Sequence, residues 1–253
     1  MNLIPENGLY LGDGLVGLER LPQGCVDLVL SDLPSGATEA EFDVKPDFDR
    51  FWGAAWSALK PSGNVVVMAS SMLFAIECIQ SQPKAFRYDL VWNKDKSTGF
   101  LNSKTRPLRS HEFILVFFGE QGTFNPQMVE TGIAICKNST PGRSHGENYG
   151  KIDTRKGLAR KGATDRYPRS VLEYECLSVQ HPTRTHPQQK PNDLFRDLVR
   201  SYSNAGDLVV DPYAGSGTTL RAAADEGRRA VGWEIQERFA VRQQLPLIPD
   251  LIP

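Results

Sequence analysis

The segment that decides the fold is Asp207-Leu208-Val209-Val210-Asp211-Pro212-Tyr213-Ala214-Gly215-Ser216-Gly217-Thr218-Thr219. Its apolar run predicts a buried strand, because short apolar runs bounded by turn residues are typical of parallel sheets. A turn with two glycines follows, and residues 218–226 have helical spacing. Glycines let the backbone approach a ligand, and the N–H groups at a helix start bind negative or polar ligand groups. The segment therefore predicts a strand–turn–helix unit that holds a ligand at its turn.

The next predicted strand, 230–234, places an acid where a bound nucleoside needs one. Glu234 lies nineteen residues after Gly215, and an acid about 20 residues beyond such glycines accepts hydrogen bonds from ribose hydroxyls. No Lys-Ser/Thr pair follows the glycines, and Leu220 stands where a dinucleotide fingerprint has its third glycine. We therefore exclude a P-loop, disfavour a nicotinamide cofactor, and predict a nucleoside without pyrophosphate, of which S-adenosylmethionine is the common example. The alternative is a tight turn whose glycines serve packing alone.

Apolar strand-like runs alternate with helix-like runs on both sides of a non-periodic stretch. Strands are predicted at 8–13, 26–30, 64–69, 88–92, 113–118, 208–211 and 230–234, and helices at 48–59, 73–80, 192–202 and 218–226. This alternation predicts an α/β fold in which helices cover both faces of a mostly parallel sheet.

A second segment, Val26-Asp27-Leu28-Val29-Leu30-Ser31-Asp32-Leu33-Pro34-Ser35-Gly36, predicts the catalytic group. Asp32 follows a buried strand, at the sheet edge where α/β proteins bind their ligands. The amino nitrogen of a base is a poor nucleophile because its lone pair is delocalised into the ring. A carboxylate and a neighbouring backbone carbonyl that accept its two N–H bonds would aim that lone pair at an electrophile, and Pro34 would stiffen the turn. The alternative is an acid that merely caps a turn.

Together the two segments resemble the paired motifs of the DNA amino-group (adenine-N6/cytosine-N4) methyltransferases, D/S/N-P-P-Y/F/W and D-P-F/Y-x-G-S-G-T-T. The catalytic motif comes first, which is similar to the circularly permuted β class. Gly12-Asp13 is similar to the family's short cofactor-adenine motif, and residues 185–191 are similar to its H-P-x-x-K-P motif, which helps bind the methionine end of the cofactor. Trp92-Asn93-Lys94, Thr98-Gly99-Phe100 and His111-Glu112 resemble a phage and prophage subgroup with a D-L-P-Y-G motif.

The resemblance implies a Rossmann-like methyltransferase fold with a seven-stranded, mostly parallel sheet and one domain over residues 1–253. It implies S-adenosylmethionine as cofactor and the catalytic residues Asp32, Leu33, Pro34 and Ser35. The cofactor-binding residues that it implies are Asp13, Asp32, Lys190, Asp211, Tyr213, Ala214, Gly215, Ser216, Gly217, Thr218, Thr219 and Glu234.

One position departs from the family pattern. Ser35 stands where the family has an aromatic residue that stacks on the flipped target base, and such stacking is worth about 1–3 kcal/mol per base. Its loss should weaken target capture about tenfold or more. Either Trp92, Phe100 or Phe42 takes this role, or the activity or the target has changed.

Residues 120–180 lack periodicity and are expected to form a basic target-recognition insertion. Between Lys137 and Arg169, nine Lys and Arg oppose three acids, a net charge of +6 in a chain whose formal charge is −1. Clustered positive charge is what a phosphate-binding surface requires, although a solvated face is the alternative. The expected DNA-binding residues are Lys104, Arg106, Arg143, Lys151, Arg155, Lys156, Arg160 and Lys161.

The composition, with 40% hydrophobic and 23% charged residues, is typical of a globular protein. Four widely spaced cysteines predict neither a disulfide framework nor a zinc site, and no metal is expected. Without a membrane span or signal peptide, we expect a cytoplasmic protein. The resemblance to the phage and prophage subgroup implies that a bacterium or a phage encodes it.

The predicted function is site-specific methylation of adenine N6 in double-stranded DNA by S-adenosylmethionine. Asp32 favours adenine, because Ser is common at that position in cytosine enzymes. Alternatives are cytosine-N4 methylation, RNA methylation, and a catalytically weakened DNA-binding relative. A homodimer and a restriction endonuclease partner are both left open.

Overall fold

The computed structural model describes residues 7–38, 43–133, 163–178, 189–240 and 247–248. The chain divides into two compact units. The larger comprises Met1–Asn125 and Ser170–Pro253, and the smaller comprises Pro126–Arg169. In the smaller unit, β6 (Val129–Glu130) pairs antiparallel with β7 (Asp165–Arg166).

One mixed sheet of nine strands organises the larger unit, in the order β11-β1-β10-β9-β2-β3-β5-β4-β8. Within this sheet, β5 runs antiparallel to its neighbours β3 and β4, and the other described pairings are parallel. The strands are β1 (Gly8–Leu11), β2 (Val26–Asp32), β3 (Leu59–Ala69), β4 (Phe86–Thr98), β5 (Arg109–Phe118), β8 (Val171–Tyr174), β9 (Leu208–Asp211), β10 (Arg229–Glu234) and β11 (Leu247–Ile248). The seven strands expected from the sequence are contiguous here, and the short strands β11 and β8 extend the sheet to nine.

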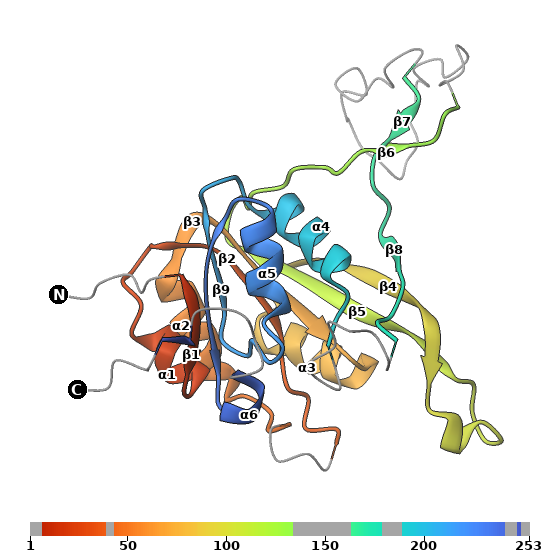
Figure 1. Ribbon diagram of the computed structural model, residues 1–253, viewed down its shortest axis with the longest axis horizontal. Coiled ribbons are helices and arrows are strands. Elements are labelled where there is room, and N and C mark those ends of the chain that lie inside the picture. Colours follow the sequence, from red (N-terminus) through yellow and green to blue (C-terminus); the bar gives the residue numbers. More distant parts are fainter. Residues whose placement is uncertain (1–6, 39–42, 134–162, 179–188, 241–246, 249–253) are drawn as a thin grey trace. The chain divides into compact units, whose positions relative to one another are not determined.

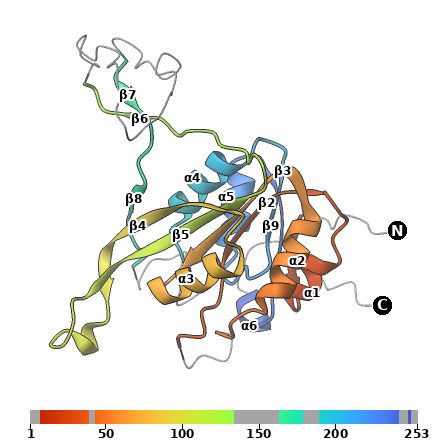
Figure 2. The ribbon, with the colours of Figure 1, turned by 180° about the vertical axis from the view of Figure 1, so that it is seen from behind.

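Helices cover both faces of this sheet (Figures 1 and 2). Side chains alternate between the faces along each strand, so Val29 packs in one hydrophobic cluster with Trp52, whereas Leu28 packs in the other with Phe195. The first cluster contains residues of α1 (Gly14–Glu19), α2 (Phe48–Ala58) and α3 (Met72–Ser81). The second contains residues of α4 (Asn192–Tyr202) and α5 (Thr218–Asp225). The short helices η1 (Phe100–Asn102) and α6 (Glu237–Ala240) complete the described elements.

The neighbouring strands β2 and β9 form a topological switch point. The chain leaves β2 through α2 on one face and continues to β3, and it leaves β9 through α5 on the other face and continues to β10. The two connections diverge, so they leave a crevice at the carboxyl ends of β2 and β9, where α/β sheets bind ligands.

Helix α1 and strand β8 are among the elements that differ from the sequence expectations. Helix α1 begins directly after Asp13, whose carboxylate accepts hydrogen bonds from the backbone N–H groups of Leu15 (2.8 Å) and Val16 (3.2 Å). This helix has only six residues, two of them glycine, so its local sequence carries little helical signal. Strand β8 lies inside the range expected for the insertion, yet it pairs with β4 of the main sheet. The four helices predicted from the sequence are confirmed as α2 to α5. None of the helices in the described ranges has the length and apolar character to cross a bilayer.

Candidate active site

Asp32 and Asp211 end the two central strands, and hydrogen bonds of Asp211 join β2 and β9 to the turn after β9. Ser31 Oγ, beside Asp32 on β2, donates to Asp211 Oδ1 on β9 (2.6 Å). Asp211 also accepts from the Tyr213 backbone N–H (3.0 Å) and the Thr219 hydroxyl. Burial raises the pKa of Asp211 to about 6, although these three hydrogen bonds oppose the shift. Asp211 therefore fastens the turn to both central strands.

The turn after β9 borders a large cavity. Gly217 has φ of +68° and precedes α5, a left-handed conformation that favours glycine. At the carboxyl end of β10, Glu234 is buried and accepts from the Gln236 N–H (2.7 Å), and burial raises the pKa of Glu234. The cavity measures about 1310 Å³ and is lined by residues from both predicted motifs, including Asp32, Pro34, Tyr213 and Glu234. Pockets for one small molecule occupy about 300–1,000 Å³, so this cavity has room for a nucleoside and a second ligand.

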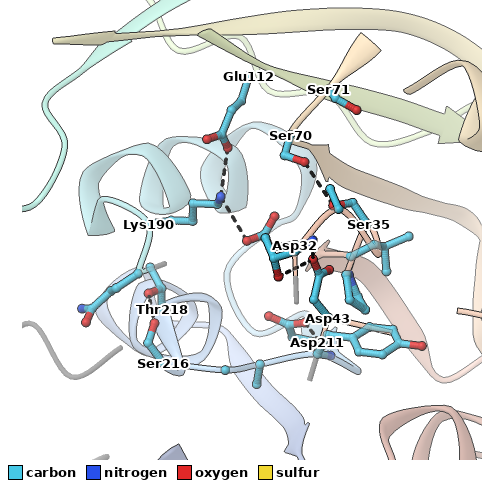
Figure 3. Close-up of a pocket in the computed structure, with 18 of the residues that line it drawn as sticks. Asp32, Ser35, Asp43, Ser70, Ser71, Glu112, Lys190, Asp211, Ser216 and Thr218 are labelled. Atoms are coloured by element: carbon cyan, nitrogen blue, oxygen red, sulfur yellow. Dashed lines mark hydrogen bonds and ion pairs between the residues drawn. The ribbon is translucent and has the colours of Figure 1, made fainter. Parts of the chain in front are cut away.

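Four side chains of alternating charge line the cavity, and Figure 3 shows three of them, Glu112, Lys190 and Asp32. Lys190 Nζ lies 3.1 Å from Asp32 Oδ2 and 2.9 Å from Glu112 Oε2. Lys94 Nζ lies 3.0 Å from Glu112 Oε1. The row crosses the sheet from β4 through β5 to β2, and Lys190 joins it from the segment before α4. We call Lys94, Glu112, Lys190 and Asp32 the ion row.

The ion row is largely shielded from water, which strengthens its internal interactions. Burial alone would lower the pKa of Lys190, but Asp32 and Glu112 raise it above its ordinary value. Burial would likewise raise the pKa of Glu112, but Lys190 and Lys94 together lower it. For Asp32, burial prevails over Lys190, and the pKa of this carboxyl is raised. Asp32 is therefore the member of the row whose ionised form is least favoured.

The loop after Asp32 is held by a further acid. Asp43 accepts from the backbone N–H groups of Gly36 (2.9 Å) and Thr38 (2.8 Å), and these bonds lower its pKa in spite of its burial. The Ser70 hydroxyl at the end of β3 donates to Ser35 Oγ (3.3 Å; Figure 3). Ser35 thus lies in a polar contact instead of presenting an aromatic face.

The residues predicted from the sequence largely converge on this cavity. Its lining includes the four predicted catalytic residues and every predicted cofactor residue except Gly217. Two side chains have partners that the sequence did not indicate, since Asp13 caps α1 and Lys190 binds the two acids of the ion row. Among the predicted DNA-binding residues, Arg106 lines the cavity and Lys104 is exposed in the β4–β5 hairpin. The other six lie outside the described residues.

The aromatic candidates for base stacking have different environments. Trp92 is only 3% exposed, donates its indole N–H to the Tyr174 carbonyl (2.8 Å), and lies under the ammonium groups of Lys94 and Lys190. Phe100 is 79% exposed in η1. Phe42 lies outside the described residues.

Three charged side chains at the site were not predicted from the sequence as functional residues. Lys94 and Glu112 occur in segments that resemble the family. Each lies beside an apolar strand run, where an unpaired charge is costly, so the sequence could have indicated that both are paired. Asp43 lies outside the catalytic motif in the sequence, and only the fold of the loop brings its carboxylate to the backbone N–H groups of Gly36 and Thr38. Among the described residues, no group of three or more His, Cys, Asp and Glu could hold a metal ion.

Comparison with known proteins agrees with this geometry. A family model described as "DNA methylase", of the N6/N4 type, matches residues 26–242. The chain is 27% identical over 243 residues to the DNA adenine methyltransferase YhdJ of Escherichia coli (strain K12), with 90% of this chain and 78% of that protein covered. Among solved structures, the cytosine-N4-specific PvuII DNA methyltransferase has a TM-score of 0.68 at 17% identity, with 95% and 88% covered. The complex of M1.HpyAVI with SAM has a TM-score of 0.61 at 19% identity, with 92% and 95% covered.

The two structures share the fold, and the family model spans most of the chain, including both strand ends that line the cavity. The chain therefore belongs to the N6/N4 DNA methylase family.

Proposed function

We propose that this protein methylates the exocyclic amino group of a base in double-stranded DNA, with adenine N6 as the target. One observation carries the proposal: Asp32 and residues 212–216 of the turn after β9 line the same cavity. A methyl donor on the turn and a base at Asp32 would then lie within reach of each other, and such proximity removes much of the entropic barrier.

The cavity suits S-adenosylmethionine. Glu234 ends β10 with a carboxylate that could accept from ribose hydroxyls, and the N-terminus of α5 offers backbone N–H groups to a polar ligand. We assign Tyr213, Ala214, Gly215, Ser216, Thr218 and Thr219 to the same ligand, with Asp13 at its edge. When bound, this cofactor supplies an electrophilic methyl group.

The chain's own residues then activate the base. We assign the Asp32 carboxylate and the Leu33 backbone carbonyl as acceptors for the two N–H bonds of the amino group. Lys190 contacts Asp32 Oδ2, so we assign Oδ1 to the substrate. Lys190 also favours the ionised carboxylate that burial disfavours, and we assign it a positioning role at Asp32 in place of a primary role at the cofactor.

The choice of adenine rests on two observations. Asp occupies position 32, and the relative YhdJ is named an adenine methyltransferase. Cytosine N4 is the second candidate, because the fold is shared with a cytosine-N4-specific enzyme and the same acceptors fit either amino group. A catalytically weakened DNA-binding protein is the third, because Ser35 offers no ring to a flipped base. A DNA substrate would place the enzyme in the cytoplasm of a bacterial or phage-infected cell, and a homodimer and an endonuclease partner stay predictions.

The decisive experiment measures transfer of a labelled methyl group from S-adenosylmethionine to unmethylated plasmid DNA. Asp32→Asn and Asp32→Ala should lower the rate by at least about 100- to 1000-fold, the usual loss when a preorganised polar contact to the reacting group is removed. Cofactor binding measured by calorimetry should stay within about threefold of wild type. Asp49→Ala, at an exposed acid on α2, is the control.

Nucleoside analysis of the labelled product by mass distinguishes N6-methyladenine from N4-methylcytosine. A wild-type protein that binds DNA and cofactor without turnover would instead establish the weakened relative. Full activity of the Asp32 variants would remove Asp32 from the mechanism, and a preference for RNA over duplex DNA would contradict the proposed substrate.

A further inference from the structure

The hairpin between β4 and β5 extends beyond the strands that flank it. Strand β3 pairs with β5 only as far as Phe113, and β8 pairs with β4 only as far as Lys94. The two hairpin strands continue to the Thr98–Arg109 pair, and η1 lies between them. Figures 1 and 2 both show this hairpin projecting from the sheet of the larger unit.

The end of this hairpin exposes apolar side chains in an ordered backbone. Phe100 is 79% exposed and Leu101 is 99% exposed. The backbone around them is held by hydrogen bonds from Asn102 N–H to the Gly99 carbonyl (2.9 Å) and from Ser103 N–H to the Phe100 carbonyl (3.0 Å). Exposure of two adjacent large apolar side chains to water is unfavourable, and this indicates that they contact a partner.

The flanks of the hairpin carry charge of one sign. Lys96, Lys104, Arg106 and Arg109 lie between positions 96 and 111, and no acid occurs there. Lys96, Arg106 and Arg109 also line the cavity that contains Asp32. The Arg109 guanidinium donates to the backbone carbonyl of Ser70, whose hydroxyl binds Ser35. An apolar end with cationic flanks therefore stands beside the proposed base-binding site.

We infer that Phe100 and Leu101 form a wedge that inserts into the base stack of duplex DNA while the hairpin cations bind the flanking phosphates. This inference rests on the proposed function and extends it to how the target base leaves the helix. Proteins that open or kink DNA insert Phe or Leu side chains between bases, and an aromatic ring on an exposed base compensates for lost stacking. Contact between two hairpin ends of separate copies is disfavoured, because it would bring like charges together.

A wedge is needed only when the target base must be extracted from a paired helix. The test therefore uses a duplex with the methylation site mapped in the plasmid assay, its target base either paired or opposite an abasic nucleotide. For the double variant Phe100→Ala/Leu101→Ala, kcat/KM should fall about 10- to 100-fold on the paired duplex. On the abasic duplex it should stay within about threefold of wild type, because the target base then has no base pair that must be broken.

The matched control is Leu73→Ala/Ile76→Ala, which removes two exposed apolar side chains from α3. Equal losses on both duplexes, no loss on either, or a loss of the same size in this control would overturn the wedge. Phe100→Trp/Leu101→Met retains large apolar side chains, so on the paired duplex it should keep most of the wild-type activity that the double alanine variant loses. Sedimentation must give the same mass for wild type and double variant, since a loss of dimers would instead identify the hairpin end as a contact between copies.

Failure of the wedge and failure of the proposed function remain distinguishable. If wild-type protein transfers no methyl group to either duplex, the proposed function is wrong. The wedge is then tested by binding without turnover, using fluorescence anisotropy with a labelled random-sequence duplex. A drop of about tenfold in the affinity of the double variant alone supports the wedge, and equal affinities of variant and wild type contradict it.

Discussion

At the residue scale, the ion row explains how a carboxylate can stay ionised in a half-buried cleft. An isolated charge there would be costly, but Lys190 contacts both Asp32 and Glu112, and Lys94 contacts Glu112 from the other side. Two cations and two anions alternate, so the row is neutral as a whole. The Lys190 ammonium group is shared between the carboxylates of Glu112 and Asp32. Asp32 therefore stays available as a hydrogen-bond acceptor for the substrate.

This arrangement predicts opposite shifts in the pH dependence of methyl transfer. Asp32 must be ionised, so activity is lost as pH falls through its raised pKa. In Lys190→Met, the cation that lowers this pKa is removed, and the acidic limb of the pH–kcat profile should move to higher pH. In Glu112→Gln, the anion that raises it is removed, and the limb should move to lower pH.

Glu112→Gln also weakens the interaction that holds Lys190, which we assign to position Asp32. A hydrogen bond to a charged group contributes about 1.5–3 kcal/mol, so kcat at pH 8 should fall about tenfold in this variant. Glu120→Gln, at an exposed acid just beyond β5, serves as the control. Shifts of the same sign in Lys190→Met and Glu112→Gln would contradict the ion row as the determinant of the Asp32 pKa.

At the scale of elements, close packing joins the start of α1 to the turn after β9. A Cβ built on Gly14 would lie 1.6 Å from the backbone oxygen of Pro212. No side chain fits there unless α1 or the turn moves. The first helix of the chain therefore buttresses the turn that we assign to the cofactor.

Gly14→Ala should lower the free energy of unfolding by at least about 1–3 kcal/mol, the usual cost of overpacking, and should weaken cofactor binding. Gly53→Ala is the matched control, because a Cβ at that position in α2 meets nothing within 4 Å. That substitution should instead stabilise the protein by about 0.5–1 kcal/mol. Urea unfolding and calorimetric titration with S-adenosylhomocysteine give both quantities, and unchanged stability in Gly14→Ala would show that the contact is readily relieved.

At the scale of the whole molecule, the charge distribution predicts the salt dependence of DNA binding. The formal net charge is −1, so attraction to DNA must come from local concentrations of Lys and Arg. Replacing Arg143, Lys151, Arg155 and Lys156 with Gln should flatten the slope of log K against log salt by up to about 0.9 for each phosphate that the protein no longer neutralises. Fluorescence anisotropy over a salt series measures this slope.

The control for this prediction is Arg20→Gln/Lys84→Gln, at two exposed cations of the larger unit. Its slope should equal that of wild type. If the fourfold variant also kept the wild-type slope, the basic segment would be a solvated face, and the cations that neutralise phosphates would have to lie elsewhere.

Much of this molecule could be predicted from the sequence, because its central strands and helices have strong local patterns. The apolar run before Asp211 and the helical spacing after Thr218 each specify their element without help from the rest of the chain. Helix α1 and strand β8 were missed because they are short and depend on tertiary contacts, α1 on packing and β8 on pairing with β4. Both acidic strand ends were predicted, but the partners of Lys190 were not, since only folding brings positions 32, 112 and 190 together.

The pairing of β2 with β9 has a consequence for synthesis. The Asp27 side chain accepts from the Leu208 N–H across 181 positions of the chain, and Leu28 pairs with Val209 beside it. At about 5–20 residues per second, a ribosome exposes β2 roughly 9–36 s before its partner emerges. Throughout that interval an apolar strand has a free edge, which is a hazard for aggregation. The nascent chain can therefore close its ligand cleft only after most of it has been made, and chaperones that shield strand edges should matter most during this delay.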